Sequence, residues 1–231
     1  MTMCALQREN VNMKQAIEFL HQTADFLIVG PRKKQPHYSY ILIHEGMALI
    51  RLGKLELPVC QNQGFWLPSG CLAAVTVLQG SLFSTFNFSI RSTVSLPNRA
   101  GYIAPSTLVE GIVEQLNMLN KNGNNAWVSA YGRLLRCARD YFALVSPDDK
   151  YDDSTLKLAE TITWLDSGGS PDNIDCISIL DLENREISEQ LKVRNWIRKM
   201  KSGQNSTYLA QQVSLTEASL MQLIGKIAGP V

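Results

Sequence analysis

Hydrophobic positions in the first half of the chain come in short runs that turn residues separate. The runs cover residues 38–52, with a turn at Glu45-Gly46, and then 55–59, 64–70, 72–78 and 82–90. Short β-rich runs divided by glycine turns, with no helical spacing between them, are typical of an antiparallel sandwich or barrel. Before them, apolar residues between 10 and 26 have a helix-like spacing, and we predict a short helix there.

From residue 105 onward the spacing changes to that of amphipathic helices. One apolar face runs from 108 to 119, and a second runs from 127 to 145, after the polar turn NKNGNN. Two such helices joined by a short loop form an antiparallel hairpin. Its apolar stripe is wider than one sheet face requires, so we expect part of it to pack against a second subunit. The predicted dimer contacts are Leu108, Ile112, Leu116, Trp127, Leu134 and Tyr141.

The last stretch, residues 205–231, has the pattern of two short helices with a turn between them. Ser206 or Thr207 can cap the first helix, Thr216 can cap the second, and Gly229-Pro230 ends it. The apolar stripe of the second helix is Leu220, Leu223, Ile224 and Ile227. This outline is that of a helix-turn-helix, although any amphipathic pair of helices shares part of it.

These patterns predict an α+β fold: an antiparallel cupin-like β-barrel, followed by a helical hairpin and a small all-α helix-turn-helix unit. We expect a sensory and dimerisation domain at residues 1–150 and an acidic linker with room for a helix over 154–165 at residues 151–186. A partial helix-turn-helix unit, preceded by a leading helix, follows at residues 187–231. The loop SGGSPDN marks the boundary by its composition.

The charge distribution is more informative than the net charge of +1. Residues 151–190 hold 2 Lys/Arg against 10 Asp/Glu, whereas residues 191–231 hold 6 against 1. A basic end behind an acidic segment suits polyanion binding, and it equally suits the solvated face of one helix. The five cysteines are scattered without a C-x-x-C, and the sequence shows neither a signal-peptide core nor a membrane-length apolar run. We therefore expect a cytoplasmic protein without a disulfide framework.

Candidate chemistry is sparse. A cupin metal site needs two or three imidazoles with a carboxylate, and the chain has only His21, His37 and His44. Motifs such as G-x-S-x-G, G-x-G-x-x-G and Walker A do not occur, so we predict no metal, no cofactor and no enzyme activity. A metal-dependent cupin enzyme is the least favoured alternative.

The barrel could nevertheless bind a small molecule. Inward-facing aromatic side chains in a small barrel can enclose one ligand, and the alternative is that they fill the core. The predicted ligand-binding residues are Tyr40, His44, Trp66, Phe86 and Phe88.

Two stretches together resemble the AraC/XylS family of bacterial transcription regulators. The first contains E-G-x6-G-K at 45–54, G-F-W-L-P-S-G at 64–70, Q-G-S at 79–81 and the strand segment 86–89. It is similar to that family's N-terminal cupin-like domain. The second, L-A-x-x-V-x-L-T-x-x-x-L-x-x-L-I-x-x-x-x-G at 209–229, is similar to the family's first helix-turn-helix. The resemblance covers roughly residues 35–145 and 187–229.

The resemblance implies a dimeric regulator that senses a small-molecule effector and binds DNA. The phosphate contacts would come from Lys192, Arg198, Lys199, Lys201 and Lys226. The groove face would be Thr216, Ser219 and Gln222, of which Gln222 could pair with adenine.

Several positions depart from the family pattern. Ala73 stands where a histidine is common, and Ser214 stands at the glycine of the turn. Ala218 and Met221 occupy groove positions, and the family's second helix-turn-helix has no counterpart in this sequence. These departures leave open an alternative: an interaction protein that does not bind DNA and instead pairs with a related, full-length regulator.

Overall fold

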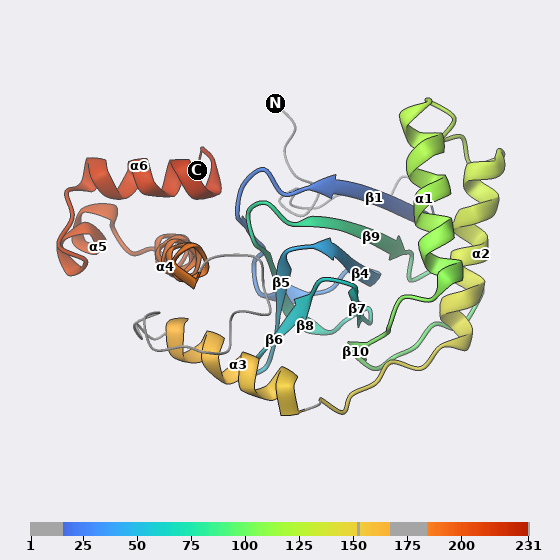
Figure 1. Cartoon of the computed structure of the whole chain (residues 1–231), viewed down its shortest axis with the longest axis horizontal. Coiled ribbons are helices and arrows are strands. Elements are labelled where there is room, and N and C mark those ends of the chain that lie inside the picture. Colours follow the sequence, from blue (N-terminus) through green and yellow to red (C-terminus); the bar gives the residue numbers. More distant parts are fainter. Residues whose placement is uncertain (1–15, 152, 167–183, 231) are drawn as a thin grey trace.

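The computed structural model describes residues 16–151, 153–166 and 184–230 (Figure 1). These residues form ten strands followed by six helices. The strands are β1 (Ile17–Thr23), β2 (Ile28–Val29), β3 (Lys33–Lys34), β4 (Tyr38–Glu45), β5 (Met47–Leu52), β6 (Leu55–Cys60), β7 (Gln63–Leu67), β8 (Leu72–Val77), β9 (Leu82–Phe88) and β10 (Gly101–Tyr102). The helices are α1 (Thr107–Lys121), α2 (Ala130–Leu144), α3 (Asp153–Asp166), α4 (Asn184–Lys201), α5 (Ser206–Gln212) and α6 (Glu217–Ala228).

The described strands form two antiparallel sheets that face each other. Sheet A has the order β1-β9-β4-β7-β10, and sheet B has the order β2-β8-β5-β6, with β3 also paired to β8. The space between the sheets is filled by apolar side chains from both, such as Ile41 and Phe83 from sheet A and Ile50 from sheet B. The predicted α+β class is confirmed, with two facing sheets in the place of one closed barrel.

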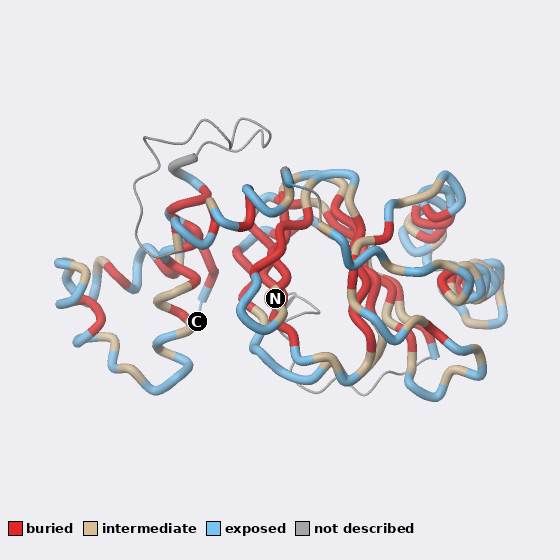
Figure 2. The backbone as a smooth tube through the Cα atoms, turned by 90° about the horizontal axis from the view of Figure 1, so that it is seen from below, coloured by how far each residue is buried: buried red, intermediate tan, exposed pale blue. Residues whose placement is uncertain are grey.

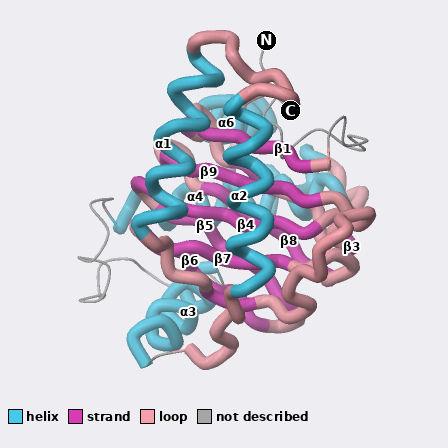
Figure 3. The backbone as a smooth tube through the Cα atoms, turned by 90° about the vertical axis from the view of Figure 1, so that its right-hand side faces the viewer, coloured by secondary structure: helices cyan, strands magenta, loops and turns pink. Residues whose placement is uncertain are grey.

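The helices cover the two outer faces of this sandwich. Helices α1 and α2 form the predicted hairpin and lie across sheet A, in front of β9, β4 and β7 in Figure 3. The C-terminal helices lie on the opposite side, against sheet B (Figure 1). Buried positions accordingly concentrate on the strands and on the helix faces turned toward them (Figure 2). The chain therefore has its hairpin and its helix-turn-helix at opposite ends of its long axis.

The turn between β4 and β5 depends on the glycine at its centre. The predicted strand–turn–strand over 38–52 is observed as β4 and β5. Gly46 joins them with a φ of +78°, and a Cβ there would lie only 2.4 Å from the Ser81 Oγ atom. Only glycine combines this backbone conformation with such a close approach. Ser81 Oγ in turn accepts a hydrogen bond from the Met47 N–H at 3.0 Å.

The helix predicted over 10–26 is wrong where the structure describes it. Residues 17–23 form β1, which pairs with β9 from Ile17↔Phe88 to Thr23↔Leu82. Ile17 and Phe19 alternate onto the face covered by the hairpin, which is the two-residue period of a strand. Residues 1–15 lie outside the described part of the chain.

The acidic segment contains the predicted helix, which is observed as α3. It packs on β6 and on α4, and its buried Leu158, Ile162 and Leu165 join the cluster against sheet B. The predicted boundary loop at residues 167–173 lies outside the described residues.

Candidate nucleic-acid interface

The two C-terminal helices and their turn have the predicted helix-turn-helix arrangement. Asn205, rather than Ser206 or Thr207, caps α5, since its Oδ1 accepts a hydrogen bond from the Thr207 N–H at 2.9 Å. Thr216 caps α6 as expected, because its Oγ1 accepts from the Ser219 N–H at 3.1 Å. These caps satisfy backbone donors at the helix starts that have no partner within the helix.

The turn between α5 and α6 contains a strained residue. Ser214 has a φ of +55°, at the position where the resembling family has glycine. A side chain in the left-handed region costs about 1–2 kcal/mol relative to ordinary backbone. The position therefore has a positive φ, and the turn keeps this backbone conformation with a serine.

Glu217 links the starts of the two helices. Its carboxylate accepts hydrogen bonds from Ser206 Oγ at 2.5 Å and from Thr207 Oγ1 at 2.8 Å. Both bonds favour the charged form and lower the pKa of Glu217, that from Ser206 more. The first turn of α6 thus carries a negative charge on an exposed surface.

The exposed face of α6 holds the predicted groove residues. Ala218, Met221 and Gln222 are exposed, and the Ser219 hydroxyl lies 2.8 Å from that of Thr216, within the cap. Gln222 is therefore the side chain on this face best suited to a paired contact with a base edge. Leu223, predicted in the buried stripe, is 37% exposed.

The basic residues predicted to contact phosphate divide into two groups. Lys192, Lys199, Lys201 and Lys226 are exposed. Arg198 is different: only 23% of its side chain is exposed, and its Nη2 lies 3.5 Å from Glu56 Oε1. Burial, followed by the neighbouring Arg194, lowers its pKa. In this arrangement Arg198 belongs to an internal ion-pair cluster and not to the basic surface.

The centre of that cluster is Arg194, which is not among the residues predicted from the sequence. Its side chain is fully buried, with Nη1 at 2.5 Å from Glu56 Oε1 and Nη2 at 2.8 Å from Asp166 Oδ1. The available signal was its spacing, because Arg194 falls on the same helical stripe as Leu191 and Ile197. A charge on an apolar stripe requires a buried partner.

The aromatic residues predicted to bind a ligand lie on the outer face of sheet A, which the hairpin covers. Tyr40, Trp66, Phe86 and Phe88 are fully buried between sheet A and the hairpin, where they surround Phe142. Tyr40 Oη donates to the Ile103 carbonyl at 3.0 Å, and Trp66 Nε1 donates to the Pro97 carbonyl at 2.9 Å. The prediction that these side chains point into the barrel is therefore wrong, because they lie on the outer face of sheet A. A strand whose two faces are both buried carries apolar side chains on each of them. Ligand binding by these residues remains a prediction.

His44, the fifth predicted ligand residue, lies in a polar group at the edge of the same layer. Its Nε2 is 2.7 Å from Ser84 Oγ, and His21 Nδ1 is 2.8 Å from the same oxygen. Burial lowers the pKa of both rings, and His44 lowers that of His21 further. One ring nitrogen of each histidine thus lies within hydrogen-bond distance of the same hydroxyl. No group of three or more His, Cys, Asp and Glu residues that could hold a metal ion occurs among the described residues.

The predicted dimer contacts also divide by position. Ile112 and Leu116 are buried against sheet A within the chain, so they are unavailable to a second subunit in this arrangement. Leu108 is 49% exposed, and the remaining three are partly buried. The exposed apolar residues of the hairpin are Leu108, Met118, Val128 and Leu144.

Within the described ranges, no helix is long and apolar enough to cross a membrane.

Comparisons with known proteins give weak structural similarities. No protein-family model and no curated protein matches the sequence. The structure of ToxT from Vibrio cholerae O395 covers 94% of this chain and 96% of its own, with a TM-score of 0.38 and 12% identity. That of the AraC-like transcriptional activator CuxR covers 88% and 84%, with a TM-score of 0.36 and 14% identity. At these values the similarity assigns neither a family nor a function.

Proposed function

We propose that this chain is a transcription regulator of the AraC/XylS type that binds DNA through its C-terminal helices. The observation that supports this is the capped helix-turn-helix of α5 and α6, which lies at the end of the molecule away from the hairpin (Figure 1) and leaves Ala218, Met221 and Gln222 of α6 exposed. In this proposal the start of α6 enters the major groove and Gln222 contacts a base. Lys192, Lys199, Lys201 and Lys226 bind phosphates on either side.

The rest of the proposal follows the same division of the chain. Residues 1–150 form a sensory and dimerisation domain, 151–186 a linker that contains α3, and 187–231 the DNA-binding unit. Two copies pair through the outer face of the hairpin, where Leu108, Met118 and Leu144 are exposed. A small-molecule effector binds to the two-sheet sandwich. Half-buried His44 is the most accessible of the predicted ligand residues. The protein acts in the cytoplasm.

The experiment is a gel shift with the upstream region of the protein's own operon at several salt concentrations. For each phosphate contact, the slope of log affinity against log salt changes by about 0.9. Lys199→Gln should therefore make the slope shallower by about one, whereas Lys54→Gln, a matched change in an exposed turn of the β-domain, should leave it unchanged. Gln222→Ala should weaken preference for the specific sequence. The absence of a shift, or a shift without sequence preference, would overturn the proposal.

One observation favours a second candidate, an interaction protein that pairs with a related regulator. The groove face combines the charged Glu217 with the exposed apolar Ala218 and Met221. A carboxylate at the start of α6 repels phosphate, and apolar side chains add little to groove recognition. Recovery of a related regulator in a pull-down, together with no DNA binding by this chain alone, would select this candidate.

A further inference from the structure

Three elements of the chain meet at one buried ion-pair cluster. Arg194 from α4 contacts Glu56 on β6 at 2.5 Å and Asp166 at the end of α3 at 2.8 Å. Arg198, one turn further along α4, reaches the same Glu56 oxygen at 3.5 Å. The cluster therefore connects the helix that leads into the helix-turn-helix to the sandwich.

Arginines outnumber carboxylates in this cluster. Arg51 lies directly across the β5–β6 ladder from Glu56 and also lowers the pKa of Arg198, after burial and Arg194. Two carboxylates thus face three guanidinium groups. Among the described residues, the buried cluster atoms Arg194 Nε, Arg194 Nη2, Arg198 Nη2 and Asp166 Oδ1 have no hydrogen-bond partner. The 2.8 Å contact between Arg194 and Asp166 is therefore an ion pair without hydrogen-bond geometry. A buried ion pair with unmet donors depends strongly on the presence of both partners, while apolar replacements of the whole pair are often tolerated.

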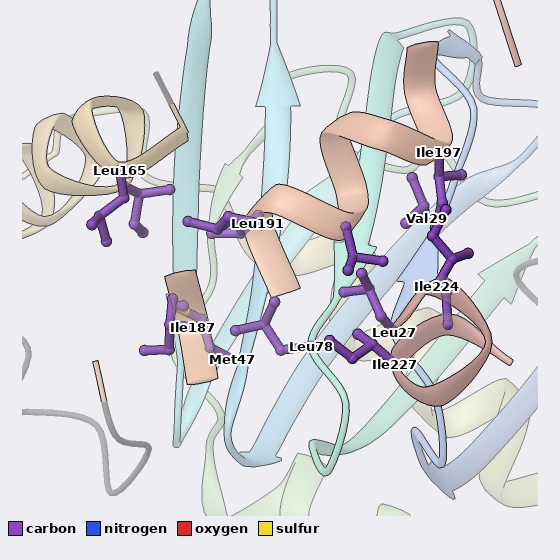
Figure 4. Packing of buried hydrophobic residues seen from close by; sticks show 14 of the residues in the cluster. Leu27, Val29, Met47, Leu78, Leu165, Ile187, Leu191, Ile197, Ile224 and Ile227 are labelled. Carbon is purple, nitrogen blue, oxygen red and sulfur yellow. The ribbon is translucent and has the colours of Figure 1, made fainter. Parts of the chain in front are cut away.

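The cluster lies beside an apolar contact that docks the helix-turn-helix on sheet B. Ile197, Ile224 and Ile227 pack near Leu27 and Val29 (Figure 4). The Leu27 N–H also donates to the Ile227 carbonyl at 2.7 Å. At the other end of α4, the Gln79 N–H donates to Gln190 Oε1 at 2.8 Å. The helix-turn-helix thus contacts the sandwich through its buried isoleucines, while Met221 and Gln222 of α6 stay exposed.

We propose that Glu56 and Asp166 compete with DNA phosphate for Arg194 and Arg198, and so keep the helix-turn-helix docked. Carboxylates and phosphates bind guanidinium groups with the same paired geometry. While the unit is docked, its exposed cations are the four lysines named above. When it is released, Arg194 and Arg198 also become available to the DNA backbone. Docking is thus a restraint on DNA binding that is built into the fold. This inference rests on the proposed function.

The first test measures docking without DNA. In Glu56→Gln the buried arginines lose their strongest partner, so amide hydrogen exchange in α5 and α6 should accelerate at least about tenfold, whereas exchange in β4 and β9 should not change. Glu114→Gln on α1 is the matched control, since it removes one exposed carboxylate and gives the same change in net charge. Its exchange should equal that of the unmodified protein. If Glu56→Gln prevents folding, Asp166→Asn, at a carboxylate that is 21% exposed, carries the same expectations.

The second test measures the salt dependence of DNA affinity for the same variants. Two additional phosphate contacts should steepen the slope of log affinity against log salt by about 1.8 in Glu56→Gln. Adding Arg194→Met to that variant should remove about half of the gain, or about 0.9. The pair Glu56→Leu/Arg194→Met replaces the ion pair with apolar contacts, and it should stay docked with an unchanged slope.

The outcomes separate this inference from the proposed function. Unchanged exchange in Glu56→Gln and Asp166→Asn would overturn the inference, and so would sequence-preferring DNA binding with the same salt slope in Glu56→Gln and the unmodified protein. In the second case the proposed function stands. Faster exchange without DNA binding by any variant would overturn the proposed function and the competition with phosphate together.

Discussion

Phe142 should be the residue on which docking of the helical hairpin depends most. It is fully buried, and its ring centroid lies 4.5 Å from that of Tyr40 and 5.6 Å from that of Trp66. Phe88 is nearly as close, at 5.8 Å. The Phe142→Ala substitution would remove the ring at the centre of this aromatic layer, between sheet A and α2.

The size of the effect follows from burial. Truncation of a fully buried phenylalanine typically costs about 3–5 kcal/mol, because transfer energy is lost and a cavity remains. With a urea dependence of about 3 kcal/mol per molar, the upper end for small proteins, the unfolding midpoint should fall by about 1–1.7 M. Ile90→Ala, in the loop after β9, is the control, since Ile90 is 62% exposed and lies outside the hairpin. Its effect should stay within about 0.5 kcal/mol.

Urea unfolding followed by tryptophan fluorescence and far-ultraviolet circular dichroism would measure both variants. Trp66 lies in the affected layer, so fluorescence reports on it directly. A loss below about 1 kcal/mol for Phe142→Ala would refute the reasoning, because a filled core cannot lose this ring so cheaply. The layer would then be loosely packed, as expected if Tyr40, Trp66 and Phe86 enclosed a ligand.

Two further predictions concern the turn and the histidines. Ser214→Gly should stabilise the helix-turn-helix by about 0.5–1 kcal/mol, because relief of the strained backbone exceeds the extra entropy of an unfolded glycine; a lower thermal midpoint would contradict this. Burial lowers the pKa of His21 and His44 below the ordinary value of 6.5, so the unfolded chain binds more protons in mildly acidic solution. The contribution of the two histidines to the free energy of unfolding should therefore be fully present above pH 6.5 and decrease as the pH falls below it. The decrease is at most about 1.4 kcal/mol per histidine and pH unit. It should be smaller than this limit because both rings are half exposed. His21→Gln/His44→Gln should flatten this dependence in thermal unfolding from pH 7.5 to 5.5, and an unchanged slope would count against it.

Local signals in the sequence were sufficient wherever a short segment determines its own structure. The turn at Gly46 and the cap at Thr216 were both predicted from neighbouring residues. Strand β1 was missed because Ala16, Ile17 and Leu20 also fit a helical spacing. Its pairing partner β9 lies far along the chain, and the register from Ile17↔Phe88 to Thr23↔Leu82 is not visible locally. Such tertiary pairing commonly overrides local propensity.

The sequence could not predict which face of sheet A its aromatic side chains occupy, and the reason is a different one. Both of its faces are buried, one against sheet B and the other under the hairpin, so apolar residues occupy successive positions. Tyr40 and Ile41 are neighbours in the chain, yet they belong to different layers. Period two separates the two sets of side chains but does not assign either set to a layer. The aromatic set was therefore placed on the wrong side of the sheet.

The same two-sided burial separates the hairpin from the helix-turn-helix. The hairpin and the helix-turn-helix cover opposite outer faces, so a second subunit and DNA would meet the chain at opposite ends (Figure 1). The described chain between them runs from α2 to α3, and it is fixed to sheet A by the Tyr102–Asp148 pair. Asp166 at the far end of α3 then holds Arg194. The chain that follows the hairpin therefore contacts sheet A at Asp148 and α4 at Asp166.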